Sequence, residues 1–508
     1  MRKEAAILVV ASAGCAMTVL DTNVVGIVLP TIARDLQASF AEIEWVISTY
    51  VLCFAALLLP AGSIADRYGR RRVFLVGIAL FAASSLACGL APSAPGLYLA
   101  RAVQGVGAAF LLAPALAIIG HTFHDEKARS HAWAIWGGIM GLTMVISPLM
   151  GGVISSSLGW RWAFFINIPV CLLLATAVVT LVDESRDPTP RTLDLPGIGL
   201  FASGMFSATW ALIAGPSHGW SSTPVLLSMI AGLLLFAVFV WVEKRRTHPM
   251  LDLELFKARP FVGAVLAMFA YASSAQVMAS LLPLFLQNGR GNGVVEAGIA
   301  MLPFATAMLI FPQVGRRLSP WLGSAEILAL GLLIVALGNL ILMFAAVQQG
   351  QLLLICGMTI LGAGGGLLNG ETQKAIMGTV PRSRAGMASG ISTTSRFTGI
   401  LLGFAGLGAV LAGGVKSAIE SRLIDAGVSA NPGFFEYVMA GDFERAIAMY
   451  PHALTETLTG LVRQSYSQGF AGAFVIAAIF SLLTSAAVYV LMRSERSYTQ
   501  SPFETRNQ

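Results

Sequence analysis

The sequence is dominated by apolar runs long enough to cross a lipid bilayer. A helix needs about 20 mostly apolar residues to span the hydrocarbon core, and backbone groups in hydrocarbon must be satisfied within the segment, which favours helices. We count fourteen such runs, at residues 5–28, 43–62, 73–92, 96–119, 132–154, 161–182, 194–214, 223–242, 261–286, 295–314, 326–347, 351–373, 390–413 and 468–492. The 508-residue chain, with only 11% charged residues, is therefore predicted to be an all-α integral membrane protein.

The basic residues predict how these helices are oriented. With the N-terminus in the cytoplasm, most of the 32 Lys and Arg residues fall on cytoplasmic segments, as the positive-inside rule requires. Both termini are then cytoplasmic, as expected of a multi-pass protein of a bacterial inner membrane. The net charge of +6 is explained by topology, so no nucleic-acid partner is expected. The one long connection between predicted spans, residues 414–468, is predicted to be an external, partly helical loop.

Several classes of function are disfavoured by what the sequence lacks. The five cysteines lie in apolar segments without metal-ligand spacing, so neither a disulfide framework nor a zinc site is indicated. The glycines at 362–366 resemble a phosphate loop, but no Lys-Ser or Lys-Thr pair follows them. No nucleophile, base and acid pattern points to an enzyme. The first run contains Asp21 and no convincing cleavage site, so we expect a retained helix rather than a signal peptide.

Two ionisable residues inside predicted spans are the first functional candidates. Asp21 lies in the first span and Arg101 in the fourth; a charged residue in hydrocarbon is costly and by default marks a pathway, relay or counter-ion. At 1.5 Å per residue, Asp21 is about 24 Å above Ala5 and Arg101 about 8 Å below the start of its span. Both are expected in the outer half, in one water-accessible cavity. A buried pair that only locks the two helices remains the alternative.

The segment between the second and third spans carries a distinctive string, GSIADRYGRRRVF, at residues 62–74. Its glycines permit a tight turn, and its aspartate is placed to cap the next helix or to bind an arginine. A positive-inside cluster accounts for the arginines at 70–72, but not for the G-x-x-x-D-R-x-G spacing. The residues that set this pattern are Gly62, Asp66, Arg67 and Gly69, and Arg70 follows directly after it.

This string resembles the loop motif of the major facilitator superfamily, and four further strings narrow the resemblance. LDTNVVGIVLPTI (20–32) is similar to the first-helix motif of the fourteen-helix drug:proton antiporter branch, the EmrB/QacA type. RAVQGVGAA (101–109) resembles the helix 4 motif of proton-coupled members, and GLTMVISPLMGG (141–152), followed by GWRWAFFINIP (159–169), resembles the antiporter motif of helix 5 and its sequel. GMASGISTTSRFTGILLG (386–403) matches the helix 13 pattern of this branch.

The resemblance implies a fold and a function. It implies two six-helix bundles, at 1–185 and 260–508, joined by two inserted helices within 186–259. It also implies a proton-coupled multidrug efflux antiporter that exports amphipathic drugs, dyes or toxic metabolites by alternating access. No cofactor is expected; the partners are the cargo, protons and the bilayer. A narrow exporter of an endogenous metabolite or antibiotic, or a non-transporting sensor or channel, remains an alternative.

The resemblance also supplies site residues and shows two departures. Gating is expected from the residues of the loop string and from Pro148, Gly151 and Gly152. The helix 5 motif commonly reads Gly-Pro where this chain has Ser147-Pro148. The counterpart of the loop string in the second half is reduced to Gly-Arg-Arg at 315–317, without the aspartate.

Proton coupling or substrate binding is expected from Asp21 and Arg101, with Glu371 and Arg396 as further candidates. For Glu371 a surface or capping role is an equal alternative, and for Arg396 the alternative is a structural salt bridge or carbonyl clamp. Gln276 and Gln287 are weaker polar candidates.

Overall fold

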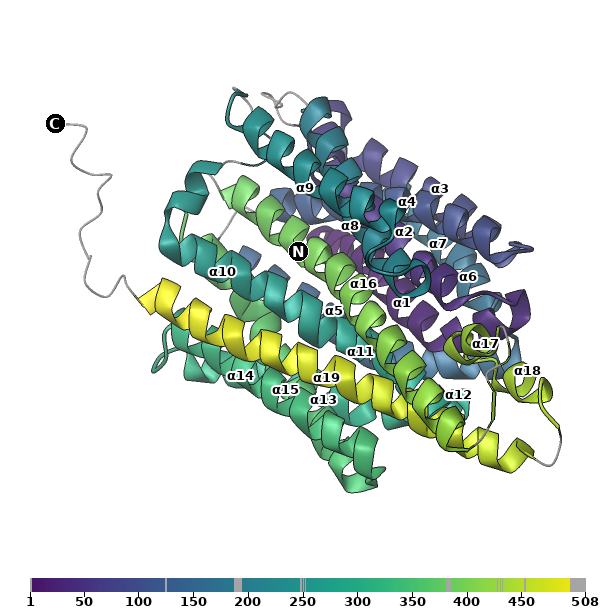
Figure 1. Cartoon of the computed structure of the whole chain (residues 1–508). Helices are drawn as coiled ribbons and strands as arrows, with labels where there is room; N and C mark the ends of the chain where they lie inside the picture. The colour runs from purple at the N-terminus through teal and green to yellow at the C-terminus, as the bar shows by residue number, and fades with distance from the viewer. Residues whose placement is uncertain are drawn as a thin grey trace.

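The computed structural model of the chain is entirely helical over the residues it describes, and Figure 1 shows most of its helices aligned along one common direction. These residues are 2–123, 126–186, 194–246, 249, 251, 253–380, 385–426, 428–429, 431, 433–451 and 454–493.

The helices fall into three consecutive groups. The first contains α1 (Arg2–Leu36), α2 (Phe40–Tyr68), α3 (Arg70–Gly89), α4 (Ala94–Thr122), α5 (Glu126–Ser157), α6 (Trp162–Phe165) and α7 (Asn167–Leu181). The second contains α8 (Leu195–His218), α9 (Thr223–Glu243) and the short 3-10 helix η1 (Leu253–Lys257). The third contains α10 (Arg259–Ala270), the π-helical η2 (Tyr271–Gln276), α11 (Val277–Leu284), the π-helical η3 (Phe285–Gly289), α12 (Val294–Ala300), α13 (Leu302–Leu318), α14 (Ser324–Gln348), α15 (Gln351–Gly378), α16 (Ala385–Asp425), α17 (Phe434–Ala440), α18 (Phe443–Ala448) and α19 (Thr455–Arg493).

The predicted number of spans is confirmed within the described residues. Thirteen helical stretches are long and apolar enough to cross a membrane, and α5 supplies the fourteenth as a bent span. Its two halves, Ile135–Met144 and Leu149–Ser157, meet at 43°. The break contains Pro148, which has no backbone N–H to donate to the preceding turn, and proline is a usual cause of such bends.

The predicted loop at 414–468 is wrong in its limits. Helix α16 continues to Asp425, and α19 already begins at Thr455. Outside the hydrocarbon core a helix no longer needs apolar residues on every face, so a hydropathy window ends before the helix does. The extensions stay helical because they pack closely: a Cβ on Gly414 would lie 3.0 Å from the Cα of Gly469. Figure 1 shows α17 and α18 beside these extensions.

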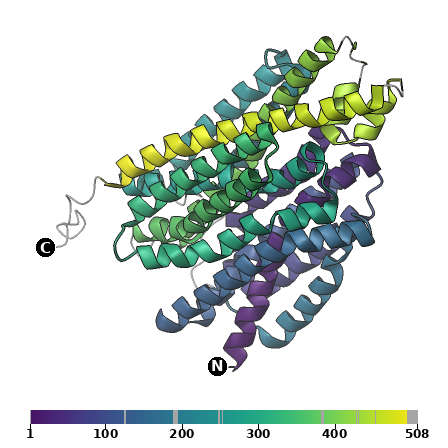
Figure 2. The same ribbon diagram turned by 90° about the horizontal axis from the view of Figure 1, so that it is seen from below.

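We call the end of the molecule where α1 begins the inner end, following the predicted orientation, and the opposite end the outer end. Helices α1 to α7 pack mainly on one another, and so do α10, α11 and α13 to α16 with α19, while α12 packs mainly on α5. Helices α8 and α9 pack as a pair, and α8 also contacts α2 and α16. Figure 2 shows this arrangement from a second side. The proposed bundle limits at 1–185, 186–259 and 260–508 remain a prediction.

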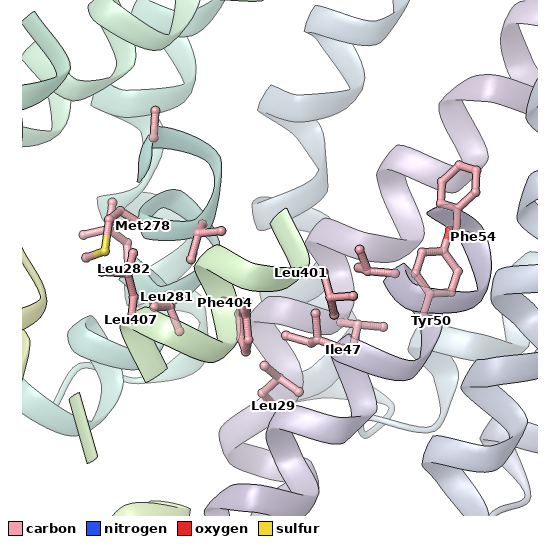
Figure 3. Packing of buried hydrophobic residues seen from close by; sticks show 14 of the residues in the cluster. Leu29, Ile47, Tyr50, Phe54, Met278, Leu281, Leu282, Leu401, Phe404 and Leu407 are labelled. Carbon is pink, nitrogen blue, oxygen red and sulfur yellow. The ribbon is translucent and has the colours of Figure 1, made fainter. Parts of the chain in front are cut away.

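The two large groups meet on two sides, where α5 packs on α12 and α13 and where α2 packs on the antiparallel α16. We call the contact between α2 and α16 the α2–α16 seam. Figure 3 shows Leu401 and Phe404 of α16 lying toward Ile47 of α2 and Leu29 of α1. The opposite face of α16 meets α11 (Figure 3). Nearer the middle of the seam, the rings of Phe54 and Phe397 lie 4.2 Å apart between centroids. The seam is therefore closed by apolar side chains in this structure.

Candidate functional site

Asp21 and Arg101 form the predicted pair at the centre of a buried polar network. Arg101 Nη1 lies 2.5 Å from Asp21 Oδ2. Asp21 Oδ1 accepts hydrogen bonds from Gln104 Nε2 at 2.9 Å and from Asn167 Nδ2 at 3.0 Å. Gln104 and Asn167 also donate to Ser85 Oγ, at 2.7 and 3.2 Å. The network thus ties α1 to α3, α4 and α7, all within the first group of helices.

Arg101 is held on its other sides by the backbone and by aromatic rings. Its Nε donates to the carbonyl of Val46 on α2 at 3.2 Å, and its guanidinium carbon lies 4.1 Å from the centroid of the Tyr50 ring. The side chains of Arg101 and Asp21 are 1% and 0% exposed. The expectation of a water-accessible cavity around the pair is therefore wrong for this state: α2 and α7 supply the side chains and carbonyl that cover it.

The arrangement matches an ionised carboxylate, because each of its three partners presents a donor. A protonated Asp21 would bring a donor of its own, and one of the present donors would have to turn away or find another acceptor. Gln104 Oε1 already accepts from Arg101 Nη1 at 2.7 Å. A proton added to Asp21 would therefore require the donors on α4 and α7 to rearrange.

The loop string forms a tight turn with a partner that the sequence did not indicate. Asp66 accepts from Arg70 Nε at 2.9 Å rather than capping α3. The cap comes from Glu184, which accepts from the backbone N–H groups of Arg71 and Arg72 at 3.1 and 3.3 Å. Gly69 joins α2 to α3 with a φ of +114°, a value that favours glycine.

The remaining gating candidates lie at helix contacts. Gly62 is half-buried near α4, where a Cβ would meet Ala113 at 3.9 Å, and the exposed Arg67 stacks on Tyr68. On α5, a Cβ at Gly151 would lie 3.3 Å from the Cα of Val24 on α1, whereas one at Gly152 would lie 3.2 Å from a carbonyl oxygen of α12. Adjacent glycines therefore permit close approach to opposite groups of helices. Pro148 lies at the bend of α5.

Glu371 and Arg396 do not join the Asp21 network. Glu371 accepts from Ser324 Oγ at 2.6 Å and pairs with Lys374 at 3.1 Å, at the inner end of α14 and α15. Both contacts are between side chains and neither caps a helix, so the role of Glu371 stays a prediction. Arg396 is half-buried and donates from Nε to Gln276 at 3.0 Å, at the end of η2. Gln287 donates to the carbonyl of Ile27 on α1 at 3.0 Å, which joins the two groups of helices.

Some residues of the network had a sequence signal that was not used. Gln104 lies three residues after Arg101 in the RAVQG string, which places both on one helix face. Asn167 lies in the FINIP string that follows α5. For Ser85 and Glu184 no pattern in the sequence points to their roles.

Comparisons with known proteins agree with this architecture. The profile of the Major Facilitator Superfamily matches residues 11–404. Multidrug resistance protein Stp of Mycobacterium tuberculosis is 34% identical over 83% of this chain and 78% of its own length. The tetracenomycin C resistance and export protein of Streptomyces glaucescens is 30% identical over 96% of this chain and 91% of its own. Multidrug efflux pump LfrA of Mycolicibacterium smegmatis is 30% identical over 93% of each chain.

A solved structure shows the same fold at low sequence identity. A bacterial homologue of the human lysosomal transporter Spinster, in an inward-facing and unoccupied conformation, superposes with a TM-score of 0.67 at 18% identity. The match covers 98% of this chain and 99% of the other.

Proposed function

The chain belongs to the Major Facilitator Superfamily, and on this premise we propose that it exports amphipathic drugs, dyes or toxic metabolites in exchange for protons. Its relatives with drug-efflux and resistance names align over most of its length. Transport proceeds by alternating access, in which the two groups of helices rock about a central cargo site. A potential of 100 mV contributes about 2.3 kcal/mol per elementary charge moved, so even one proton per cargo molecule supplies useful driving force.

The observation that carries the proton coupling is the closed network around Asp21. This acid is fully buried at membrane depth, and all its contacts are donors. A group so arranged exchanges its proton only when the helices around it move. Arg101 serves as the counter-ion when Asp21 is ionised, and Gln104 and Asn167 hold the carboxylate in place. Protonation then frees Arg101 from Asp21 and loosens α1 from α4.

A narrower cargo is the second candidate. The relative from Streptomyces glaucescens is named for resistance to, and export of, one antibiotic, tetracenomycin C, and it aligns with 96% of this chain. A pump for a single product would keep the same Asp21 network and differ in the residues that line the cargo path. Growth-inhibition profiles of cells with and without the protein, against a chemically varied panel, separate one protected compound from many.

The test of the proposal uses purified protein in liposomes with an imposed pH gradient. We expect uphill movement of a cationic dye such as ethidium, and cargo-induced proton release from the detergent-solubilised protein. Asp21→Asn keeps the size of the side chain and removes the exchangeable proton, so both signals should fall to the level of protein-free controls. Undiminished pH-driven transport by Asp21→Asn would contradict the proposal. Glu254→Gln, an exposed acid outside the spans, is the matched control.

A further inference from the structure

Glu44 is a second buried acid, and the sequence analysis did not single it out. It lies one turn into α2, near the outer end, and is 2% exposed. Its Oε1 is buried and accepts no hydrogen bond. In the part of the chain that the structure describes, no ion pair reaches this carboxyl either. Asp21 has three donors around it, whereas Oε1 of Glu44 has none among these residues.

The carboxyl of Glu44 lies in the α2–α16 seam. A Cβ on Gly408 of α16 would overlap its Oε1, so the carboxyl rests directly against the α16 backbone. From Glu44 to Phe54 along α2 is about 15 Å, and from Gly408 to Phe397 along α16 about 16 Å, at 1.5 Å per residue. The Phe54–Phe397 contact and the Glu44–Gly408 contact are therefore two points on one antiparallel seam. Any movement that parts the outer ends of α2 and α16 uncovers Glu44.

The charged and titratable groups near the outer half of the seam leave Glu44 without a cation. The Tyr466 hydroxyl of α19 lies within electrostatic range of its carboxyl and accepts from Asn288 at 3.2 Å. The cations on the elements packed against α2 are engaged by other groups: Arg101 of α4 by Asp21, Arg34 of α1 by the Pro30 carbonyl, and Arg396, Lys416 and Arg422 of α16 by Gln276, the Phe435 ring and Ser465. The other titratable groups near the outer end are Asp35 of α1, bound by Arg161; Glu420 and Asp425 of α16; His218 of α8, beside Trp210; and Glu436 of α17. None is within 4.0 Å ion-pair distance of Glu44.

We propose that Glu44 is a second proton-binding group, which must take up a proton from the outer side before α2 and α16 can close against each other. An ionised carboxylate without a cation or a donor is strongly disfavoured in a buried apolar contact. The neutral acid fits the closed seam. When the seam parts, water reaches the carboxyl, and it ionises as an exposed glutamate does.

The direction of the pH effect follows from proton counting. The closed seam binds one proton at Glu44, and the open seam binds fewer at any pH above the range in which an exposed glutamate titrates. Raising the outer pH therefore favours the open seam, and lowering it favours the closed one. For one proton, the open-to-closed ratio changes by at most about tenfold per pH unit.

This inference rests on the alternating access of the proposed function, but not on Asp21 as the coupling group. Asp21 lies within the first group of helices, whereas Glu44 lies between the two groups. An acidic exterior would protonate Glu44 and promote the return of the emptied carrier from the outward-open state. Glu44 thus controls the outer closure, and the Asp21 network controls the exchange.

The experiment measures the opening of the outer end directly. Spin labels go on Leu90→Cys at the outer end of α3 and Gln348→Cys at the outer end of α14, both exposed. Cys53 and Cys356, which are not buried, are first replaced by Ala. Pulsed electron paramagnetic resonance on the full chain in liposomes then gives the distribution of distances between the two labels from pH 5 to pH 9. We expect the longer-distance population to grow with pH in the protein that keeps Glu44.

Neutral replacements should remove this response. Glu44→Gln and Glu44→Met are both expected to hold the short distance across the whole pH range, because neither side chain ionises. Two variants are used so that one misfolded protein does not decide the result. Glu42→Gln is the matched control: Glu42 is two residues away on α2 in a capping box with Ser39, and its variant should titrate as the parent does.

The outcomes separate this inference from the proposed function. A pH-independent distance in protein that still exports dye, or a pH response that survives both Glu44 variants, overturns the role of Glu44. If the label distance still depends on pH in Asp21→Asn, Glu44 acts separately from Asp21. If the pH dependence is lost in that variant, a separate role of Glu44 is contradicted. A protein that shows the expected pH dependence of the label distance but transports no compound of the panel would overturn the export proposal. The assignment of Glu44 would then stand.

Discussion

Asp21 and Glu44 are two buried acids in the outer half of one protein, and their surroundings are opposite. Asp21 is bound by Arg101, Gln104 and Asn167 and joins helices of a single group. Oε1 of Glu44 has no donor among the described residues, and it lies where two groups of helices meet. The first environment stabilises a charge and the second excludes one. In the mechanism that we propose, the position of each acid relative to the moving interface determines which step its protonation controls.

The comparison has a structural consequence for mutations. Removing a partner of Asp21 leaves a buried charge uncompensated, which destabilises the folded protein. Removing the acid at Glu44 leaves no charge behind, so it should alter the balance between open and closed states. We expect changes in the Asp21 network to appear as lost stability and changes in the seam as shifted populations.

The largest expected effect is that of Arg101→Ala. With the guanidinium gone, the Asp21 carboxylate is buried without its cation, and loss of one partner of a buried pair costs about 3–5 kcal/mol. Unfolding in a denaturing-detergent titration should show this loss. The double variant Asp21→Asn, Arg101→Ala should recover a large part of it. Strictly additive losses would contradict a direct pair.

Asn167→Ala should have an intermediate effect. It removes the donor to Asp21 Oδ1 and to Ser85 while Arg101 and Gln104 remain, and a lost buried hydrogen bond costs about 1–3 kcal/mol. Cargo-induced proton release should become weaker or shift in pH. Asn339→Ala is the control, because Asn339 is equally buried but donates only to Val335 of its own helix. If both variants lost equal stability and the proton release stayed unchanged, Asn167 would have no special link to Asp21.

The adjacent glycines of α5 give the sharpest test of the difference between a contact inside one group and a contact between the two groups. Gly151→Ala presses on α1 within the first group, so we expect a stability loss of about 1–3 kcal/mol from overpacking. Gly152→Ala presses on α12 of the other group, at the outer end. Its strain can be relieved by opening, so the Leu90–Gln348 label pair should shift toward the long distance.

The smaller of these two effects is the shift by Gly152→Ala. A bias of about 1 kcal/mol changes the population ratio about fivefold. If Gly151→Ala and Gly152→Ala gave the same stability loss and the same label distance, the contact of α5 with α1 would not differ in its effect from the contact with α12.

The sequence predicted the helical membrane fold, its fourteen spans and its family well. Hydrophobic length and charge asymmetry are local properties, so they could be read without tertiary structure. The limits of the segment 414–468 were wrong because helix continuation outside hydrocarbon depends on packing between α16 and α19. The Asp21–Arg101 pair was predicted from depth alone, because two costly charges at one level of the membrane have few other partners.

Other parts of the site needed the folded chain. Gln104 and Asn167 stood in strings already recognised, yet their convergence on Asp21 depends on how α4 and α7 pack against α1. Glu184 caps α3 across 112 residues of sequence, and no local pattern predicts such a contact. Arg396 and Glu371 were further candidates after Asp21, and only the folded chain places them beside Gln276 and Lys374, outside the Asp21 network.

By itself the sequence determined that this chain crosses a membrane many times, because its composition and the length of its apolar runs leave few alternatives. It also determined that at least one carboxyl group, that of Asp21, lies within a membrane span. Only the tertiary structure decided that Asp21 is paired with a cation and that Oε1 of Glu44 is buried without a hydrogen-bond partner among the described residues. Glu44 stands at the second position of the predicted span 43–62, beside a tryptophan, where the sequence does not tell a buried acid from a polar residue at a helix end. Its role depends on a glycine 364 positions away, because a carboxyl is costly or harmless according to what faces it in space.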